Sequence, residues 1–539
     1  MKYKPSIILI FLLSLAFRLW QLNWDNNNHL HPDERMIVMV SERISLKELN
    51  PKFFAYGSFP IYLLHFISSL LSASYDSATL YGRAISAIFD SFTVILVIRL
   101  CYLLFKSTKT SLLAGLIYSL SFFPIQLSHF YAVDTILNFF IFFTLYHLVQ
   151  FYQTQKFRYA IFSGIGFGLS LATKISATML IFSIATTLTV DIFLSIVKKI
   201  HYRPLKLKNI ILSFFLVTLL TAITFILFEP FAILDFSTFW RQINEQRAMT
   251  RNAFVFPYTL QYVNTIPYLY HLKNIFIWGL GPILGSLALI GGIFTLAKLF
   301  KGLLSPGNEE YEGSQLIILI FFFTYFLATG NFAVKFMRYC LPLYPIFAIL
   351  ISRFIFSLPK KLFLLISTIF VLHLFWLFAF LSIYRFPNTR VQATSWISQN
   401  VPPGSTILRE HWDDGLPLGY TSDYNLQELA LYESDNKPDK WPIINQQLDK
   451  GDYLVIASNR LYTPLQKLTD CSRLPPDRCY PITANYYRDL FSGKLAYQKV
   501  AEFTSYPQIF GIALNDQSAD ESFTVYDHPK VTIFKKVNQ

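Results

Sequence analysis

Two consecutive acidic residues, Asp33 and Glu34, are the first candidates for chemistry in this chain of 539 residues. They follow an apolar run, Ile7 to Trp20, that is long enough to enter a bilayer. A carboxylate at an apolar boundary is partly desolvated, so it can accept a proton from a hydroxyl or an amine. An ordinary solvated loop is the alternative interpretation. The position of the pair favours chemistry on a membrane-bound substrate.

Two histidines, His29 and His31, precede this pair, and Pro32 stiffens the connection. A His-x-His pattern close to acids could bind a divalent metal, or its rings could simply form hydrogen bonds. Because the metal pattern has low specificity, we expect that the protein requires no metal and no other cofactor.

A third acid, Asp134, lies at the end of the segment 128–134, next to a predicted span. Ionisable groups at the level of the membrane are costly and by default mark a site. The alternative is a cap for the helix that follows, a position where Asp is favoured. The sequence leaves both interpretations open.

Several cations fall on the same predicted side of the membrane and could neutralise a lipid phosphate, for which arginine offers a bidentate fork. Snorkelling of these side chains to the interface is the alternative. The candidates for phosphate and donor binding are Lys174, Lys335, Arg338, its neighbour Tyr339 and, as a weaker candidate near the end of a span, Arg83.

The elements that must position these residues are apolar helices. Hydrophobic residues make up 53% of the chain, and 54 residues are phenylalanine. Many apolar runs reach the ~20 residues that cross a bilayer, which predicts a polytopic α-helical membrane protein with about 11 transmembrane helices. A shorter apolar segment, 59–74, is expected to be a re-entrant or interfacial helix. The predicted spans are 6–22, 83–105, 110–128, 135–153, 159–173, 175–197, 209–228, 274–299, 315–331, 339–357 and 362–384.

The distribution of charge predicts the orientation. Residues 1–385 contain 31 basic and 15 acidic residues, whereas residues 386–539 contain 15 basic and 18 acidic residues. A basic excess confined to the membrane part follows the positive-inside rule and does not indicate nucleic acid as a partner. We expect a multi-pass protein of the plasma (inner) membrane with a cytoplasmic N-terminus and outer loops at 24–82 and 229–273. The bases of the inner connections are Lys2, Lys4, Lys106, Lys109, Lys156, Arg158, Lys198, Lys199, Arg203, Lys206, Lys208, Lys298, Lys301, Lys360 and Lys361.

Residues 386–539 lack a long apolar run and are predicted to form a separate extracytoplasmic α/β domain. A disulfide between Cys471 and Cys479 would suit that compartment, whereas Cys101 and Cys340 lie within predicted spans and would be packing residues. A helix is expected at Val391–Gln399, and strands are expected at Thr406–Arg409, Tyr453–Ala457, Phe523–Tyr526 and Val531–Lys535.

The chain has no Walker-type phosphate loop, no dinucleotide-binding glycine motif after a strand, no Gly-x-Ser-x-Gly and no Cys-x-x-Cys. These absences argue against an ATPase, a dinucleotide enzyme, a serine hydrolase and a thiol oxidoreductase.

Four short motifs together resemble the GT-C glycosyltransferases, in particular the family 39-like, phospholipid-carrier-dependent group of protein O-mannosyltransferases and aminoarabinose transferases. The resemblance covers residues 1–385, which would form the transmembrane GT-C catalytic domain. The motifs are the Asp33-Glu34 loop, Asp134 reached through Ser128-His129-Phe130, the turn Ala172-Thr173-Lys174, and the segment Arg338-Tyr339 with Pro342 and Pro345.

The resemblance implies transfer of a hexosyl or pentosyl group from a polyprenyl-phosphate-linked donor to an acceptor (a protein, a lipid or a cell-envelope glycan) at the outer face of the membrane. Asp33 would be the general base, Glu34 would support it, and Asp134 would orient the acceptor or a metal. The leaving lipid phosphate would be neutralised by Lys174, Lys335 and Arg338. A single displacement of this kind inverts the anomeric carbon, since no second, nucleophilic carboxylate is used. The domain 386–539 departs from the well-known mannosyltransferases, which leaves the donor sugar and the acceptor open.

A polytopic transporter or lipid flippase is the alternative from another functional class, because it would also contain many spans and intramembrane charges. The clustering of acids and bases on one side, the large outer domain and the lack of a detectable internal repeat favour the transferase. A non-catalytic scaffold would leave the acidic and basic clusters unexplained.

Overall fold

The computed structural model describes residues 4–198, 207–303, 309–420 and 422–537, and its chain divides into two compact units. The first unit comprises Met1–Leu22, Pro32–Gln246 and Pro267–Leu377, and the second comprises Asn23–His31, Arg247–Ile266 and Phe378–Gln539. The second unit thus includes two short segments in addition to the predicted domain. Four bases that enter the orientation argument, Lys2, Lys199, Arg203 and Lys206, lie outside the described residues.

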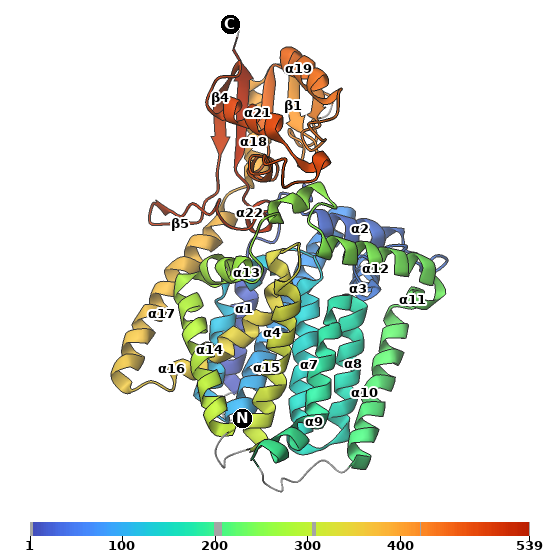
Figure 1. Ribbon diagram of the computed structural model, residues 1–539, viewed down its shortest axis with the longest axis vertical. Coiled ribbons are helices and arrows are strands. Elements are labelled where there is room, and N and C mark those ends of the chain that lie inside the picture. Colours follow the sequence, from blue (N-terminus) through green and yellow to red (C-terminus); the bar gives the residue numbers. More distant parts are fainter. Residues whose placement is uncertain (1–3, 199–206, 304–308, 421, 538–539) are drawn as a thin grey trace. The chain divides into compact units, whose positions relative to one another are not determined.

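Apolar helices dominate the first unit (Figure 1). An apolar segment in lipid must satisfy its backbone polar groups internally, which selects the helix. Hydroxyl caps set two of the helix starts: Ser74 accepts a hydrogen bond from the backbone of Ser77, and Ser107 accepts one from Thr110. From α1 to α17, with η marking 3-10 or π helices, the elements are α1 (Lys4–Leu19), α2 (Pro32–Arg43), α3 (Ser58–Leu70), α4 (Tyr75–Phe105), α5 (Thr108–Ser119), α6 (Phe122–Ser128), α7 (Asp134–Thr154), α8 (Phe157–Thr173), η1 (Ile175–Met179), α9 (Leu180–Lys198), α10 (Leu207–Phe228), α11 (Phe231–Leu234), α12 (Phe236–Arg251), η2 (Pro257–Tyr262), α13 (Leu269–Lys273), η3 (Asn274–Gly279), α14 (Gly281–Leu303), α15 (Glu309–Gly330), η4 (Met337–Leu343), α16 (Tyr344–Ile355) and α17 (Lys360–Leu381).

Within the described residues, 8 helices are long and apolar enough to cross a membrane, or 9 if the bent pair α5 and α6 forms one span. Each of them corresponds to a predicted span. The other two predicted spans, 6–22 and 159–173, are the helices α1 and α8, which have only 16 and 17 residues. Their length falls below the ~20 residues of a full crossing. The chain is a multi-pass integral membrane protein.

The helix α8 packs against both α7 and α10, and α7 also packs against α4; Figure 1 shows these helices side by side. Two glycines on α8 permit the close approach to α10. A Cβ atom at Gly164 would lie 2.8 Å from the carbonyl oxygen of Val217, and one at Gly168 would lie 2.8 Å from that of Thr221. Small residues four positions apart are a common device for tight helix packing in membranes.

The short apolar segment predicted at 59–74 forms α3, a helix of 13 residues. Its length of about 20 Å is too short for a hydrocarbon layer of about 30 Å. Its buried residues include Pro60, Ile61 and Leu64, and the helix packs against α2 and α4. The expectation that this segment does not span agrees with its length.

A five-stranded mixed sheet in the order β2-β1-β3-β7-β4 forms the centre of the second unit. The strand β1 pairs in parallel with β2 and β3, whereas β7 is antiparallel to β3 and β4. Alternate side chains of the sheet enter two apolar clusters, one with Leu408 and Leu454 and one with Ile407 and Val455. The elements are η5 (Ser382–Arg385), α18 (Thr389–Asn400), β1 (Thr406–Glu410), β2 (Asn425–Leu429), α19 (Lys440–Lys450), β3 (Tyr453–Ile456), α20 (Tyr462–Leu465), η6 (Pro476–Arg478), α21 (Pro481–Phe491), β4 (Tyr497–Phe503), β5 (Gln508–Ile509), β6 (Ile512–Ala513), α22 (Glu521–Thr524) and β7 (Val531–Lys536).

The helix and three of the four strands predicted for this domain are present as α18, β1, β3 and β7. The strand predicted at Phe523–Tyr526 is wrong, because the helical turn α22 occupies Glu521–Thr524. The Asp520 side chain accepts a hydrogen bond from the backbone of Ser522 and thereby starts this turn. The disulfide between Cys471 and Cys479 is confirmed, and Cys101 and Cys340 are free and buried.

Candidate active site

Two of the predicted residues, Asp33 from the first turn of α2 and Arg338 from η4, meet in an ion pair. The Arg338 Nη1 atom donates to the Asp33 carboxylate, and its Nη2 atom lies 3.5 Å from the Tyr56 hydroxyl oxygen. The Asp33 side chain is 22% exposed and the Arg338 side chain is 12% exposed. Both groups are therefore accessible to a substrate, although each is largely shielded.

A second ion pair joins the other two predicted outer charges. The Lys174 Nζ atom lies 2.8 Å from Asp134 Oδ1. It also lies 5.8 Å from the ring centroid of Tyr56 and 5.1 Å from that of Tyr339. Two aromatic faces therefore stabilise the ammonium group. Because Tyr56 contacts Arg338 and Lys174 alike, it joins the two ion pairs into one polar cluster, which we call the Asp33 cluster (Asp33, Tyr56, Asp134, Lys174, Arg338 and Tyr339).

The ends of helices position the Asp33 cluster. Asp134 is the first residue of α7, and Lys174 directly follows the last residue of α8. The loop with Tyr56 is fixed by Gly57, whose backbone nitrogen donates to the carbonyl oxygen of Thr173 at 3.0 Å. A Cβ atom at Gly57 would lie only 1.9 Å from the carbonyl oxygen of Ala172. Glycine is therefore required where this loop touches α8.

The loop before α3 is also held from the other side, by Glu229 at the end of α10. The Ser58 hydroxyl donates to Glu229 Oε1 at 2.7 Å, and the backbone nitrogen of Ser58 donates to Oε2. Burial raises the pKa of Glu229 to about 7. A cavity of about 20 Å³, room for about one water molecule, adjoins Tyr56, Gly57 and Glu229. Glu229 thus helps to fix the loop that contains Tyr56, through its hydrogen bonds to Ser58.

The adjacent carboxylate, Glu34, is not part of the Asp33 cluster. It forms two hydrogen bonds with Arg83, at 2.7 and 2.9 Å, and both side chains are fully buried. Glu34 also accepts from the backbone nitrogen of Tyr131 at 3.0 Å, and Arg83 donates to the carbonyl oxygen of Leu22 at 2.7 Å. The guanidinium of Arg83 is thus occupied by protein groups. The pair fixes α2 to α4 and to the segment that precedes Asp134.

Lys335 lies close to Arg338 in the sequence, but its side chain makes a different contact, with the backbone of Ala333. It is 3% exposed, and its Nζ atom donates to the carbonyl oxygen of Ala333 at 3.1 Å. Burial lowers the pKa of Lys335. Nearby, the buried His271 lies 3.4 Å from the sulfur of Cys340 through Nδ1, and burial lowers the pKa of His271 to about 4. Lys335 adds positive charge to this region from a buried position.

The two histidines before Asp33 belong to the second unit. His31 is 1% exposed and its ring lies 4.2 Å from the ring of Tyr526, centroid to centroid. His29 has a positive φ of 51° in the loop before it. In the described part of the chain, no three His, Cys, Asp or Glu residues form a group that could hold a metal ion. That the protein requires no metal stays a prediction.

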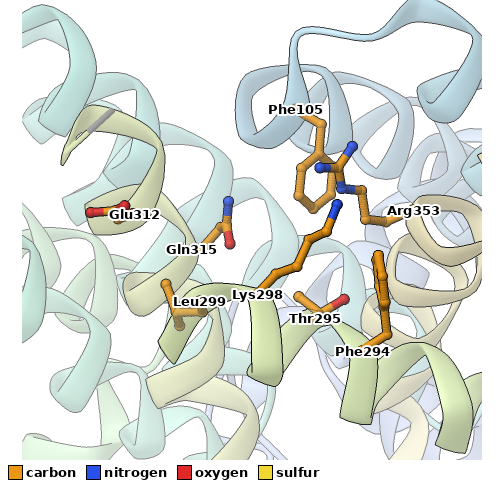
Figure 2. Close-up of a pocket in the computed structure, with 8 residues that line it drawn as sticks. All are labelled: Phe105, Phe294, Thr295, Lys298, Leu299, Glu312, Gln315 and Arg353. Carbon is orange, nitrogen blue, oxygen red and sulfur yellow. The ribbon is translucent and has the colours of Figure 1, made fainter. Parts of the chain in front are cut away.

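A separate cavity of about 200 Å³ lies where α4 and α16 end and α15 begins, which is the other end of the helices from the Asp33 cluster. Figure 2 shows Lys298 and Arg353 extending toward each other there, with Gln315 across the cavity. The Lys298 Nζ atom lies 4.8 Å from the ring centroid of Phe294. No predicted site residue lines this cavity.

Sequence reasoning did not identify Tyr56 as a site residue. Burial raises the pKa of its hydroxyl, so the phenol stays protonated and can donate a hydrogen bond. A tyrosine in a loop gives no local signal of this role. The only hint in the sequence is the following Gly57, whose importance depends on a contact with residues more than a hundred positions away.

One known family matches part of the chain. Residues 59–230 match the family described as dolichyl-phosphate-mannose-protein mannosyltransferase. This range contains two members of the Asp33 cluster, Asp134 and Lys174, and nearly all of the helices from α3 to α10; Tyr56 lies three residues before it. A sequence search of the curated proteins finds no significant match.

Solved structures with a similar fold include two enzymes that were determined with a lipid phosphate bound. The oligosaccharyltransferase AglB from Archaeoglobus fulgidus, in complex with an inhibitory peptide and a dolichol-phosphate, aligns with a TM-score of 0.54 at 12% identity, over 99% of this chain and 88% of that chain. ArnT from Cupriavidus metallidurans, bound to undecaprenyl phosphate, aligns with a TM-score of 0.53 at 10% identity, over 99% of this chain and 98% of that chain. At these identities the likeness concerns the fold.

The alignments extend over nearly the whole chain, so the helices and the sheet domain both have counterparts in these two structures. The family match and the fold agree with the resemblance found in the motifs. Residues 59–230 thus match the family of dolichyl-phosphate-mannose-protein mannosyltransferases, and the chain as a whole has a fold similar to those of AglB and ArnT.

Proposed function

We propose that the protein transfers a sugar from a polyprenyl-phosphate-linked donor to an acceptor at the outer face of the membrane. The single observation that carries this proposal is the Asp33 cluster, in which each of two carboxylates is paired with a cation and all four groups lie at one end of the helices. Glycosyl transfer needs a base on the acceptor side of the anomeric carbon and positive charge on the leaving side. The similar structure of AglB contains a dolichol-phosphate and that of ArnT contains undecaprenyl phosphate, which supports a lipid phosphate as the leaving group.

In this proposal the phosphate of the donor binds to Arg338 and Lys174. Arg338 is shared: its Nη1 atom now donates to Asp33, and an incoming phosphate competes for the same guanidinium. Donor binding would therefore weaken the hold of Arg338 on Asp33 and make the carboxylate more basic. The base would become available only when a donor is present.

The chemical step is a single displacement. Asp33 takes the proton of the acceptor hydroxyl or amine while that atom attacks the anomeric carbon. The bond between the anomeric carbon and the phosphate oxygen breaks, and its electron pair leaves with the lipid phosphate. Arg338 and Lys174 neutralise the negative charge that develops there, and the configuration at the anomeric carbon inverts.

The remaining predicted residues receive supporting roles in this proposal. Asp134 holds Lys174 in place and orients the acceptor, and Tyr339 provides an aromatic face for Lys174. Glu34 and Arg83 are positioning residues, because they form an ion pair with each other in the interior of the protein. Lys335 contributes positive potential without touching the phosphate.

The proposed orientation places the Asp33 cluster and the second unit outside the cytoplasm. It is supported by the other end of the helices, where Lys106, Lys156, Arg158 and Lys301 lie at or near the ends of α4, α7, α8 and α14. An excess of bases marks the cytoplasmic side. The disulfide between Cys471 and Cys479 suits an oxidising outer compartment.

The test is transfer from a panel of radiolabelled polyprenyl-phosphate sugars to membrane and exported fractions, with wild type and Asp33→Asn compared. Labelling by the wild type alone would support the transferase and reveal the class of donor and acceptor. Labelling by Asp33→Asn at the wild-type rate would refute the base assignment. If no donor gives labelling, a lipid-translocation assay would test the transporter in its place.

A further inference from the structure

The hairpin formed by β5 and β6 has an apolar tip. Ile509 pairs with Ile512, and Phe510 and Gly511 form the turn between them. Phe510 is 85% exposed and Ile512 is 66% exposed. The chain contains no charged residue between Glu502 and Asp516, although the rest of the domain contains many. Large exposed apolar side chains grouped in this way mark an interaction surface.

The backbone of the turn strengthens this interpretation. Phe510 has a φ of 51° and Gly511 a φ of 80°, as a type I′ turn requires at both central residues. Asn-Gly is the pair that suits this turn, because Asn tolerates the left-handed region and a bulky side chain does not. Phe510 therefore occupies a backbone conformation that is unfavourable for a bulky residue, and this places an aromatic ring at the tip of the hairpin. Such strain is often found at functional positions.

The base of the hairpin is fixed at the end of a membrane span. The backbone nitrogen of Gln508 donates to the Ser382 hydroxyl at 3.0 Å, and the Ser505 hydroxyl donates to the carbonyl oxygen of Ile383 at 3.4 Å. Ser382 directly follows α17, an apolar helix of 22 residues. Such a helix is about 33 Å long, close to the thickness of the hydrocarbon layer. The hairpin therefore begins at the level where the span leaves the hydrocarbon.

Other side chains near this end have the character of an interfacial belt. Phe378, in the last turn of α17, is 48% exposed, and Phe386, after η5, is 51% exposed. The guanidinium carbon of Arg385 lies 5.7 Å from the ring centroid of Phe386. Exposed aromatic rings together with a snorkelling cation are typical of the boundary between lipid and water.

We propose that the tip Ile509–Ile512 inserts into the interfacial region of the lipid bilayer beside the end of α17. The occupant of this surface is lipid, with acyl chains against Phe510 and Ile512 and phosphate headgroups near Arg385. The hairpin then anchors the second unit to the membrane surface at a point additional to its covalent connections to the first unit. This proposal does not depend on the catalytic assignment.

The test uses the full chain in lipid nanodiscs with an environment-sensitive fluorophore on a single introduced cysteine. The sites are Phe510→Cys and Ile512→Cys, with Ile443→Cys on α19, which is 53% exposed, as the control. The native cysteines do not interfere, because Cys101 and Cys340 are fully buried and the other two form a disulfide. We expect blue-shifted emission and quenching by nitroxide-labelled lipid at 510 and 512, and quenching by aqueous iodide at 443. If 510 and 512 behave like 443, or resist both quenchers because protein covers them, the proposal is overturned.

A second variant separates lipid insertion from folding. Phe510→Asn removes the ring but suits the type I′ turn, so the thermal unfolding temperature in detergent should not fall. With a fluorophore at Ile512→Cys, this variant should shift quenching from the lipid nitroxide toward aqueous iodide. An unchanged lipid quenching at 512 would show that Phe510 has no part in insertion and would refute the proposal as stated.

Discussion

Asp33 and Glu34 are consecutive in the chain, yet their carboxylates bind different arginines in different environments. Glu34 is fully buried against Arg83, whereas Asp33 remains 22% exposed beside Arg338. One acidic dipeptide therefore provides both a structural anchor and a group that can reach a substrate. The division predicts that the two residues respond differently to the same chemical change.

Replacing Glu34 by Gln should destabilise the fold, because it leaves the Arg83 guanidinium buried without its counter-charge. Removing one partner of a buried ion pair costs about 3–5 kcal/mol. Thermal unfolding in detergent measures the effect, and the double variant Glu34→Gln, Arg83→Met should recover part of the loss. Asp33→Asn is the matched comparison and should unfold near the wild-type temperature. Equal unfolding temperatures for Glu34→Gln and wild type would contradict the anchoring role.

Replacing Lys174 by Met should impair donor use while the fold is retained. The Lys174 side chain is 14% exposed, and its ammonium group pairs with Asp134 in the same cluster as Arg338. Loss of one cation that stabilises charge in a transition state reduces turnover by about 100-fold. Initial rates of transfer at several donor concentrations would check this. Lys298→Met, at the other end of the helices, is the control and should leave the rate unchanged; a similar loss there would point to a general effect of charge.

Replacing Gly57 by Ala should displace the loop that holds Tyr56. The added methyl group would lie 1.9 Å from the carbonyl oxygen of Ala172, which is backbone and cannot rotate away. The rate of transfer should fall, with less protein in the folded fraction. Gly292→Ala on α14 is the control, because a Cβ atom there meets nothing within 4 Å. That substitution should be neutral or stabilise the helix by about 1 kcal/mol. If Gly57→Ala left the rate of transfer unchanged, the contact between Gly57 and Ala172 would not be needed to position Tyr56.

The second unit should lose stability as the pH rises from about 4.5 to about 8. Burial raises the pKa of Glu410 from 4.5 to about 8, and the carboxyl group accepts a hydrogen bond from the Tyr487 hydroxyl at 2.5 Å. In this range the folded state keeps a proton that the unfolded state has released, so stability falls by about 1.4 kcal/mol per pH unit. Below about pH 4.5 and above about pH 8, the ionisation of Glu410 no longer changes the stability of the second unit.

Thermal unfolding of the full chain between pH 5 and 8 tests this dependence. Glu410→Gln should flatten it, since the amide stays neutral and still accepts from Tyr487. The variant and the wild type should unfold at similar temperatures near pH 5 and diverge as the pH rises. Parallel curves for the two proteins would show that Glu410 does not keep its proton.

The membrane helices could be predicted because hydrocarbon imposes one solution on an apolar run of sufficient length. The prediction was less accurate for α1 and α8, whose apolar runs are shorter than a full crossing. The strand expected at Phe523–Tyr526 failed for a local reason: an alternating apolar pattern was outweighed by the cap that Asp520 provides. Short segments of this kind are decided by caps and by tertiary contacts.

The members of the candidate site were easier to find than their partners. Asp33, Asp134, Lys174 and Arg338 stand out because charges near spans are rare, and the structure brings these four together. That Asp33 would pair with Arg338 and Glu34 with Arg83 could not be derived, because both contacts join residues far apart in sequence. The second unit was likewise recognised only in part, since its segments 23–31 and 247–266 belong to it through contacts alone.

The hydrogen bond from Gly57 to Thr173 joins two stretches of main chain, and so it is indifferent to most of the side chains around it. Because main-chain atoms form this contact, most lipid-facing residues nearby could be replaced by other apolar residues without breaking it. Substitutions on the lipid-facing side of α8 should therefore leave Tyr56 beside Arg338 and Lys174.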